Sequence, residues 1–513
     1  MRRLTELKGW RANLAAVIGG GLLPLSMAPF NLFPLAIISL GALFLLWLPL
    51  SPKQAFWRGW WYGLGMFGVG VSWVYVSIHY FGYASVPLAI LLTLIWVAFL
   101  ALLPAIAGFL TLYFLRWYRG NETRYLHLEL LLVMPVVWSL VEWVRGWILT
   151  GLPWLNPGYS QILTPLGGYA PIFGVYGVNW LVALTAGLLV LLIWRWKERR
   201  LPYLAALLAI WVVGAGLRLV EWTEPFGNPI KVSMIQGNID QAEKWKPGQL
   251  QKTLNLYTDL TEQHWDSDLI IWPEAALSTW YHHVQNGYLR GLEQRARETD
   301  TEMLIGIPYY DHATKTKYNS VLALGGEGHA FYHKHHLVPF GDYLPLENYL
   351  RGLIAFFDLP MSSFSAGPYD QAPLNVLGHN ISVSICYEDI FGEEVIRTLP
   401  LASFLVNVSN DSWWGDSHGT HQHMQIATMR SLETGRPMLR ATNNGITVVV
   451  DRWGHVTARL PQFETAVLTT EIQPRRGATP YVRVGNTLVI LMMFAVLGAL
   501  LIWRWRERRT QAA

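Results

Sequence analysis

Long apolar runs fill the first part of the chain and return once near its end. A helix needs about 20 apolar residues to cross a hydrocarbon layer of about 30 Å. Eight runs approach or exceed that length, at residues 13–30, 34–50, 57–79, 86–115, 129–149, 171–194, 201–219 and 484–504. The pattern predicts a multi-span α-helical membrane bundle of about eight spans.

The stretch between the last two runs has a different pattern. Short β-rich runs occur at Val232–Gln236, Leu269–Trp272, Met303–Ile307, Ser320–Leu324, Ile381–Ile385, Phe404–Val408, Thr447–Val450 and Ala466–Ile472. Helix-like segments near 249–264, 287–299, 388–398 and 419–434 alternate with them, which indicates a layered α/β domain. We therefore expect a bundle at 1–221, an α/β domain at 222–480, and a final span with a basic tail at 481–513.

Composition supports a membrane protein. Of the 513 residues, 52% are hydrophobic and only 14% are charged, which is unusual for a soluble protein of this size. The net charge of +4 is small, and the basic residues gather beside the apolar runs, so we expect no nucleic-acid partner. A single cysteine excludes an intramolecular disulfide.

Lysine and arginine mark alternate ends of the runs, and this bias predicts cytoplasmic loops. Basic residues occur at Arg2, Arg3, Lys8, Arg11, Lys53, Arg58, Arg116, Arg119, Arg124, 194–200 and 503–509. The intervening connections 31–33, 81–85 and 151–170 have none. We expect a multi-pass protein of a bacterial inner membrane, with both termini cytoplasmic and the α/β domain on the periplasmic side.

Two features inside the runs have structural alternatives. Gly63–Gly68 spells G-x-G-x-x-G without a preceding strand, so close helix packing, with Gly59 one turn earlier, explains it better than a nucleotide site. Glu142 and Arg145 can pair on one helix face. Bundle packing and a role in substrate access are equally open for that pair.

The only cysteine, Cys386, lies within S-V-S-I-C-Y-E-D-I (382–390), where an apolar run gives way to carboxylates. If a strand ends at Ile385 and a helix opens at Glu388, helical N–H groups would favour a thiolate at this corner. The alternative is a small buried residue without chemistry. Other residues must decide between these interpretations.

Candidate partners for a nucleophile follow other predicted strands. Glu274 comes directly after a buried run and Pro273, where a partly desolvated carboxylate can act as a base. Lys334 lies between a strand-like segment and a Pro/Gly loop, where its ammonium group can stabilise an oxyanion. Asp416, His418, His421 and His423 are metal-ligand types, but no second cluster completes a site, and we expect no metal.

These residues occur in motifs that resemble the nitrilase superfamily, and within it the membrane-embedded apolipoprotein N-acyltransferase family. The motifs are W-P-E-A-A (272–276), K-x-H-L-V-P-F-G-x-Y-x-P (334–345), C-Y-E-D (386–389), N-V-S-N-D-S-W-W-G-D (407–416) and R-A-T-N-N-G-I-T (440–447), with P-W-L-N-P-G-Y-S-Q (153–161) in a connection between apolar runs. The resemblance covers essentially the whole chain and implies a nitrilase-like α-β-β-α sandwich.

The resemblance also implies roles for individual residues. Glu274 would be the base, Lys334 the oxyanion stabiliser, and Cys386 the nucleophile. Asp342, Tyr387 and Glu388 would support them; Asp342 stands where the family often has the longer Glu. As further expectations, Trp245, Trp280, Asn407, Trp413 and Trp414 would bind substrate, while Phe356 and Phe357 lie in a possible lid at 353–364.

The implied reaction is a ping-pong acyl transfer through a cysteine thioester, the last step of lipoprotein maturation. The donor would be a phospholipid, typically phosphatidylethanolamine, and the acceptor the N-terminal diacylglyceryl-cysteine of an apolipoprotein. We expect no cofactor and a monomer. Two alternatives remain: a membrane-anchored amidase or nitrile hydrolase, which would need water as second nucleophile, and a transporter or scaffold, in which Cys386 would be dispensable.

Overall fold

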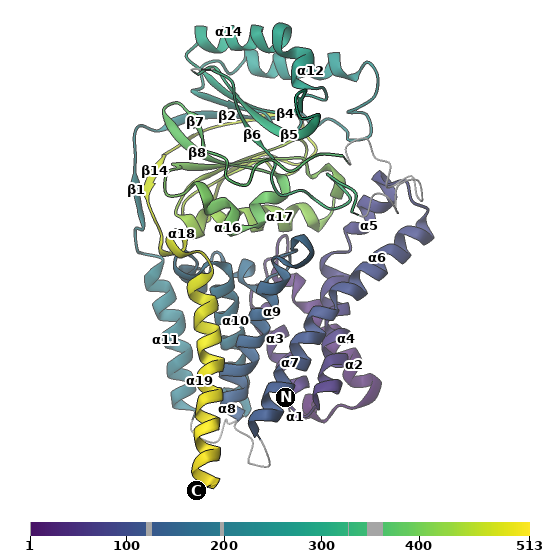
Figure 1. Cartoon of the computed structure of the whole chain (residues 1–513), viewed down its shortest axis with the longest axis vertical. Helices are drawn as coiled ribbons and strands as arrows, with labels where there is room; N and C mark the ends of the chain where they lie inside the picture. Colours follow the sequence, from purple (N-terminus) through teal and green to yellow (C-terminus); the bar gives the residue numbers. More distant parts are fainter. Residues whose placement is uncertain (1, 120–125, 195–199, 327, 346–362, 513) are drawn as a thin grey trace. The chain divides into compact units, whose positions relative to one another are not determined.

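A computed structural model describes residues 2–119, 126–194, 200–326, 328–345 and 363–512 (Figure 1). The chain divides into two compact units. The helical unit comprises Met1–Val74, Ile90–Val220 and Val484–Ala513, and the α/β unit comprises Tyr75–Ala89 and Glu221–Arg483. Tyr75–Ala89, which the sequence pattern assigns to the bundle, therefore groups with the α/β unit.

The helical unit contains most of the apolar runs as α-helices. Its main helices are α2 (Gly9–Leu22), α3 (Pro34–Trp47), α4 (Pro52–Gly70), α6 (Val86–Leu100), α7 (Leu102–Arg119), α9 (Met134–Arg145), α10 (Ala170–Trp194), α11 (Leu201–Leu217) and α19 (Thr487–Ala512). Within this unit, α4 packs against α2 and α7, and α10 packs against α3, α9 and α11.

Fewer helices than the eight expected spans meet the length and apolarity needed to cross a membrane. Among the described residues there are four, Val86–Arg116, Leu126–Arg145, Pro165–Trp194 and Thr487–Glu507. A fifth results if Pro52–Gly70 and Val74–Phe81, bent by 61°, form one span. α3 and α11 are apolar but shorter; at 1.5 Å per residue, helices of this length fall short of a layer of about 30 Å.

Glycines in α4 allow close helix contacts, as the sequence predicts. A Cβ added at Gly65 would lie 2.0 Å from the Val17 carbonyl oxygen of α2. A Cβ at Gly59 would lie 2.3 Å from the Pro104 carbonyl oxygen, and one at Gly63 would lie 2.6 Å from the Ala101 Cα. Only glycine fits at these three positions, so Gly63 and Gly65 of the G-x-G-x-x-G pattern serve helix packing.

Glu142 and Arg145 form the predicted pair on α9, and both are buried. Arg145 Nε donates to Glu142 Oε1 at 3.1 Å. Its Nη1 donates to the carbonyl oxygens of Leu152 and Trp154. Arg145 therefore holds the connection after α9 in place, which supports the packing interpretation of this pair.

The α/β unit is built on two six-stranded sheets with matching topology. One has the order β13-β2-β3-β4-β5-β6 and the other β12-β11-β10-β9-β8-β7. In the first, β2, β3 and β4 are parallel; in the second, β8, β9 and β10 are parallel. The strands are β2 (Ile230–Gln236), β3 (Leu269–Ile271), β4 (Glu302–Asp311), β5 (Thr316–Leu324), β6 (Ala330–His333), β7 (Leu374–Val376), β8 (His379–Ile385), β9 (Phe404–Ser409), β10 (Met438–Thr442), β11 (Val448–Val450), β12 (Val456–Arg459) and β13 (Ala466–Ile472).

Three apolar layers hold the sheets and their helices together. The layer between the sheets combines residues such as Val232 and Ile271 of one sheet with Val383 and Val406 of the other. A second layer packs α12 (Gln249–Glu262) and α14 (Arg290–Glu298) on the first sheet. A third packs α17 (His418–Thr434) and α16 (Gly392–Val395) on the second. The helices thus cover the two outer faces, giving an α-β-β-α sandwich (Figure 1).

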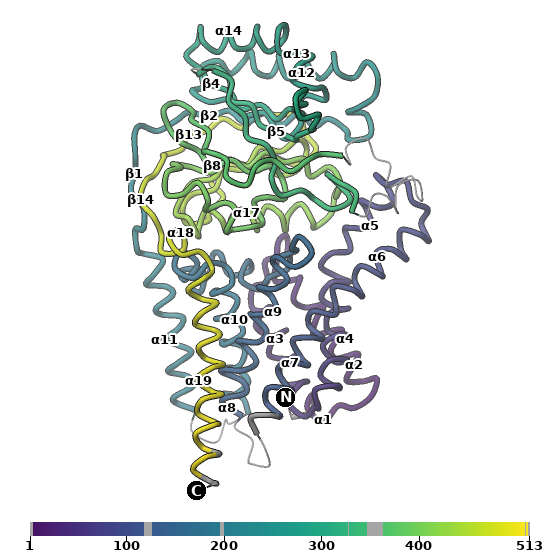
Figure 2. The backbone as a smooth tube through the Cα atoms, in the orientation of Figure 1, coloured from purple at the N-terminus to yellow at the C-terminus, as the bar shows by residue number. Residues whose placement is uncertain are grey.

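The chain enters and leaves the sandwich at one place. β1 (Thr223–Pro225) pairs antiparallel with β14 (Arg475–Gly477), with Thr223 opposite Gly477. Directly inward, β2 pairs antiparallel with β13, and Ile230 lies opposite Ile472. The backbone trace shows these first and last strands side by side (Figure 2). The two ends of the segment Glu221–Arg483 therefore pair with each other.

Candidate active site

The three residues with predicted chemical roles follow strand ends and lie together in the α/β unit. Glu274 follows β3, Lys334 follows β6, and Cys386 follows β8. Glu274 is 8% exposed and Lys334 is 1% exposed, while Cys386 is partly buried. Charged side chains this deeply buried need partners, and the contacts of each residue show what those partners do.

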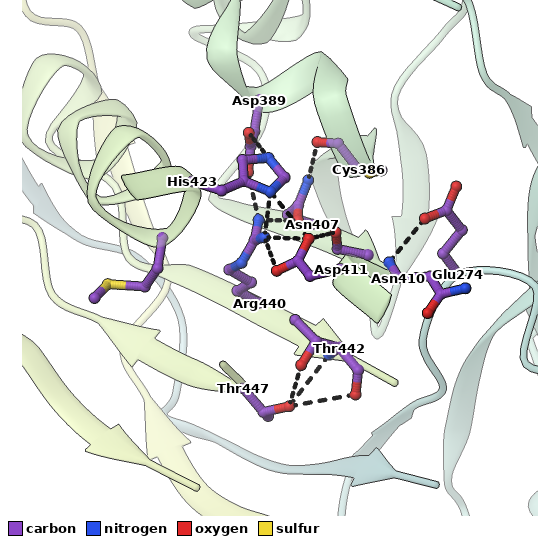
Figure 3. A network of polar contacts seen from close by, with 12 residues as sticks. Glu274, Cys386, Asp389, Asn407, Asn410, Asp411, His423, Arg440, Thr442 and Thr447 are labelled. Atoms are coloured by element: carbon purple, nitrogen blue, oxygen red, sulfur yellow. Dashed lines mark hydrogen bonds and ion pairs between the residues drawn. The ribbon is translucent and has the colours of Figure 1, made fainter. Parts of the chain in front are cut away.

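Both carboxylate oxygens of Glu274 accept hydrogen bonds. Asn319 Nδ2 on β5 donates to Oε1 at 2.7 Å. The backbone N–H of Asn410, just after β9, donates to Oε2 at 2.8 Å (Figure 3). Lys334 Nζ lies 3.5 Å from Oε1. These contacts fix the direction of the carboxylate, as a base requires.

Lys334 lies between two carboxylates. Its Nζ is 2.7 Å from Asp342 Oδ2, in addition to the Glu274 contact. Burial acts against the charge, but Asp342 and Glu274 outweigh it and raise the pKa of Lys334. Asp342 Oδ2 also accepts the backbone N–H of Val338 at 2.8 Å. The shorter aspartate thus reaches the lysine directly, and Lys334 is a fixed cation.

Cys386 occupies a strained turn. It begins the 3-10 helix η9 (Cys386–Ile390) with φ of 53°, a left-handed conformation that costs a non-glycine residue about 1–3 kcal/mol. The expected α-helix at Glu388 is therefore a short turn, and α16 starts only at Gly392. The turn places the Cys386 side chain directly after the end of β8.

The thiol is held in its neutral form, contrary to the sequence-based expectation of a favoured thiolate. Burial is the main cause that raises the pKa of Cys386, and the negative charge of Glu274 adds to it. Lys334 acts in the opposite direction but does not compensate. A one-turn 3-10 helix supplies little dipole, so burial decides. Attack by Cys386 therefore needs a base to accept its proton.

Glu388 connects the turn Cys386–Ile390 to the residues that directly follow Lys334. Its Oε1 accepts the backbone N–H groups of His335 at 2.6 Å and His336 at 3.1 Å. Its Oε2 accepts the backbone N–H of Ile385 at 2.7 Å and the Tyr332 hydroxyl at 3.0 Å. Burial raises the pKa of Glu388 to about 7. This carboxyl group is therefore structural, and its protonation changes near neutral pH.

The raised pKa of Glu388 predicts a pH-dependent stability. Between the ordinary value of 4.5 and about 7, the folded protein binds a proton that the unfolded chain releases. This contribution is complete below the lower value and is lost as the pH rises through the upper one, a loss of about 3 kcal/mol. Glu388→Gln resembles the protonated form, so its thermal unfolding, measured from about pH 4.5 to 8, should lack this slope.

Glu393→Gln is the matched control, since Glu393 is an exposed carboxylate on the neighbouring helix α16. It should retain the pH dependence of the wild-type protein. Equal slopes in the wild-type and Glu388→Gln proteins would contradict the assignment.

The aromatic residues predicted to bind substrate are partly exposed. Trp245, Trp280, Trp413 and Trp414 all have intermediate exposure. Trp413 connects to the segment Tyr75–Ala89, since the Ser77 hydroxyl donates to its carbonyl oxygen at 2.8 Å, and Phe81 lies 5.6 Å from its ring. Substrate binding by these tryptophans stays a prediction.

The remaining predicted residues are Asn407, Tyr387 and the two phenylalanines of the possible lid. Asn407 is fully buried, and its amide group contacts Ser384 and the Cys386 carbonyl oxygen. Its role in substrate binding stays a prediction. Tyr387 packs against His336 and Phe391. Phe356, Phe357 and most of the possible lid lie outside the described residues.

Sequence reasoning missed several groups around Glu274. Asn319 and Asn410 orient its carboxylate. Lys244, 2% exposed, lies with Nζ 3.4 Å from the Glu274 carbonyl oxygen, and burial lowers its pKa to about 8. Asn410 stands in the quoted N-V-S-N-D motif, which could have indicated it. Asn319 and Lys244 carry no comparable signal, because an isolated Asn or Lys is usually solvated.

Two family models match the chain. The apolipoprotein N-acyltransferase N-terminal domain matches residues 19–188, and carbon-nitrogen hydrolase matches residues 231–481. Among solved structures, the C. elegans NitFhit protein is similar at 17% identity with a TM-score of 0.39, covering 50% of this chain and 62% of that one.

Curated relatives match over nearly the whole length. Apolipoprotein N-acyltransferase of Methylococcus capsulatus is 44% identical over 489 residues, covering 95% of each chain. That of Azotobacter vinelandii is 44% identical over 513 residues, covering 99% of this chain and 98% of the relative. The chain is therefore a member of the apolipoprotein N-acyltransferase family, an acyltransferase with a carbon-nitrogen hydrolase domain.

Proposed function

We propose that the protein transfers an acyl chain from a phospholipid to the N-terminal diacylglyceryl-cysteine of apolipoproteins through a thioester on Cys386. One observation carries the mechanism: a neutral thiol lies in the field of both a fixed carboxylate, Glu274, and a fixed cation, Lys334. A nucleophile, a base and an oxyanion stabiliser are the three groups that acyl transfer needs.

The first half-reaction forms the acyl-enzyme. Glu274 accepts the thiol proton as Cys386 Sγ attacks an ester carbonyl of the donor, typically the sn-1 ester of phosphatidylethanolamine. Lys334 and the backbone N–H of Tyr387 stabilise the oxyanion of the tetrahedral intermediate. The ester C–O bond then breaks, Glu274 returns the proton to the leaving oxygen, and a lysophospholipid departs.

The second half-reaction uses the same groups in reverse. The α-amino group of the acceptor has an ordinary pKa near 8 and is mostly protonated at neutral pH. It loses that proton to solvent, its nitrogen attacks the thioester carbonyl, and Glu274 accepts one of the two amine protons and passes it to the Cys386 sulfur. The C–S bond breaks, the thiol of Cys386 is restored, and the acceptor leaves as an N-acyl amide.

Both proposed substrates are anchored in lipid, so the enzyme must itself be held at a membrane. We infer about eight spans, with shorter apolar helices such as α3 and α11 completing those that meet the full length. The bias of lysine and arginine supports cytoplasmic termini and a catalytic unit on the periplasmic side of a bacterial inner membrane. The donor can then reach Cys386 from the outer leaflet.

Label transfer tests the proposal. The purified full-length protein is incubated with phosphatidylethanolamine labelled on its sn-1 chain, and a hydroxylamine-labile label is expected on Cys386. Adding a diacylated peptide with a free N-terminus should move the label into an amide, whereas the same peptide with an acetylated N-terminus should leave it on the enzyme. Release only as free fatty acid would instead identify a hydrolase.

A further inference from the structure

Four ionisable side chains form a buried cluster close to Cys386. They are Asp389, Asp411, His423 and Arg440, with exposed fractions of 0%, 2%, 0% and 0%. Each comes from a different segment: the nucleophile turn, the loop after β9, helix α17 and strand β10 (Figure 3). Burying four ionisable groups is costly unless they satisfy one another, so their contacts indicate their purpose.

Arg440 joins the two aspartates. Its Nη1 lies 2.7 Å from Asp389 Oδ2, and its Nη2 lies 3.0 Å from Asp411 Oδ2. His423 makes the same connection from the other side, with Nε2 3.0 Å from Asp389 Oδ1 and Nδ1 3.0 Å from Asp411 Oδ1. His423 Nδ1 also lies 2.9 Å from Arg440 Nη2, so the two bridges contact each other and together fix the distance between the two carboxylates.

Asp389 and Arg440 connect the cluster to Cys386. Asp389 belongs to the turn that begins at Cys386. Arg440 Nη1 donates to Asn407 Oδ1 at 2.6 Å, which fixes the orientation of that amide. Asn407 Nδ2 then donates to the Cys386 carbonyl oxygen at 3.2 Å. A left-handed residue persists only when its surroundings hold it, and these contacts hold Cys386.

Asp411 connects the cluster to the loop that contacts Glu274. Asp411 Oδ1 accepts the Ser409 hydroxyl at 2.8 Å, which links Asp411 to the end of β9. Between Ser409 and Asp411 lies Asn410, whose backbone N–H donates to Glu274 Oε2. Asp411 therefore fixes the short loop that orients the Glu274 carboxylate.

We propose that Asp389, Asp411, His423 and Arg440 are positioning residues that hold Cys386 and Glu274 at a fixed separation for proton transfer. This inference rests on the proposed roles of Cys386 and Glu274. The cluster joins the turn that begins at Cys386 to the loop that orients Glu274, and it does so through buried groups. Proton transfer between a thiol and a carboxylate depends steeply on that separation.

His423→Gln and Asp389→Asn test the proposal, because each keeps the approximate size of the side chain and removes bridging contacts. The rate of acyl-enzyme formation should fall about 10²-fold in each, the size expected for a displacement of about 1 Å. The KM for phosphatidylethanolamine should change less than about threefold, since only transition-state interactions are lost. Alkylation of Cys386 by iodoacetamide should also slow.

The double variant adds a readout that a purely structural role would not give. Residues that act as one unit show non-additive losses, so His423→Gln/Asp389→Asn should be about as slow as the slower single variant. If the fold losses in rate of the two single variants multiply in the double variant, the residues do not act as one unit, and the proposal is overturned. If the histidine variant does not fold, Arg440→Lys, which keeps the charge but cannot bridge two carboxylates in the same way, replaces it.

Glu433→Gln is the matched control. Glu433 is fully buried on the same helix, and it pairs with Arg430, with Arg430 Nε 3.2 Å from its Oε2. This variant should lower the apparent Tm but leave acyl-enzyme formation unchanged in the folded protein. Wild-type rates in the folded cluster variants would overturn the inference. Absence of any label on Cys386 in the wild-type protein would instead contradict the proposed function.

Discussion

Replacing Cys386 with alanine is expected to reduce acyl transfer by about 10⁴-fold or more, because the proposed mechanism assigns the acyl chain to this thiol alone. Cys386→Ser should be nearly as inactive, since the site that already holds a thiol neutral offers no means to ionise a far less acidic hydroxyl. The labelled phospholipid assay measures both steps, and neither variant should form a hydroxylamine-labile intermediate.

Ser382→Ala is the matched control for these variants. Ser382 lies on the same strand, β8, and its hydroxyl donates to the Val395 carbonyl oxygen at 3.1 Å, away from Glu274. It should retain labelling near the wild-type rate. Appreciable peptide acylation by Cys386→Ala would refute the thioester mechanism and restore the interpretation of a merely buried cysteine.

Lys334→Met should cost both activity and stability. The substitution leaves Glu274 and Asp342 buried without their shared cation, with side-chain exposures of only 10% and 11%. Breaking a buried ion pair on one side typically destabilises a protein by about 3–5 kcal/mol. Thermal unfolding in detergent should show a clearly lower apparent Tm, and the acyl-enzyme should be undetectable even in the folded fraction.

A second substitution separates the two losses. In Lys334→Met/Asp342→Asn one of the uncompensated charges is removed, so part of the stability should return. Acyl-enzyme formation should not return, because the oxyanion still lacks its cation. Recovery of activity together with stability would show that Lys334 acts only as a structural counter-ion.

The elements that carry the site could be predicted where the pattern is simple. β3, β8 and β9 are short, fully apolar or alternating runs with a clear end, and the residue after a buried strand is an identifiable position. β10 could not be recognised in this way, and β6 could be recognised only as a strand-like segment before Lys334. β6 is an edge strand with mostly half-exposed residues, and β10 carries the buried Arg440.

The ionisation of the site could not be predicted, because it depends on distances between segments far apart in the chain. The strand-to-helix corner favours a thiolate in isolation, but burial and Glu274 reverse the direction at Cys386. His423 shows the same limit. Its sequence neighbours include other metal-ligand residue types and give no sign of its partners in the fold, which are Asp389 and Asp411.

The pairing of first and last strands has a consequence for biosynthesis. β2 completes its hydrogen bonds only when β13 arrives, since Ile230 lies opposite Ile472. Until the ribosome has released that last strand, one side of β2 remains an open edge, which favours pairing with other chains. A chain that stops before Ala466 should therefore be handled by the cell as an unfolded protein, even though every residue of its reaction centre has already been synthesised.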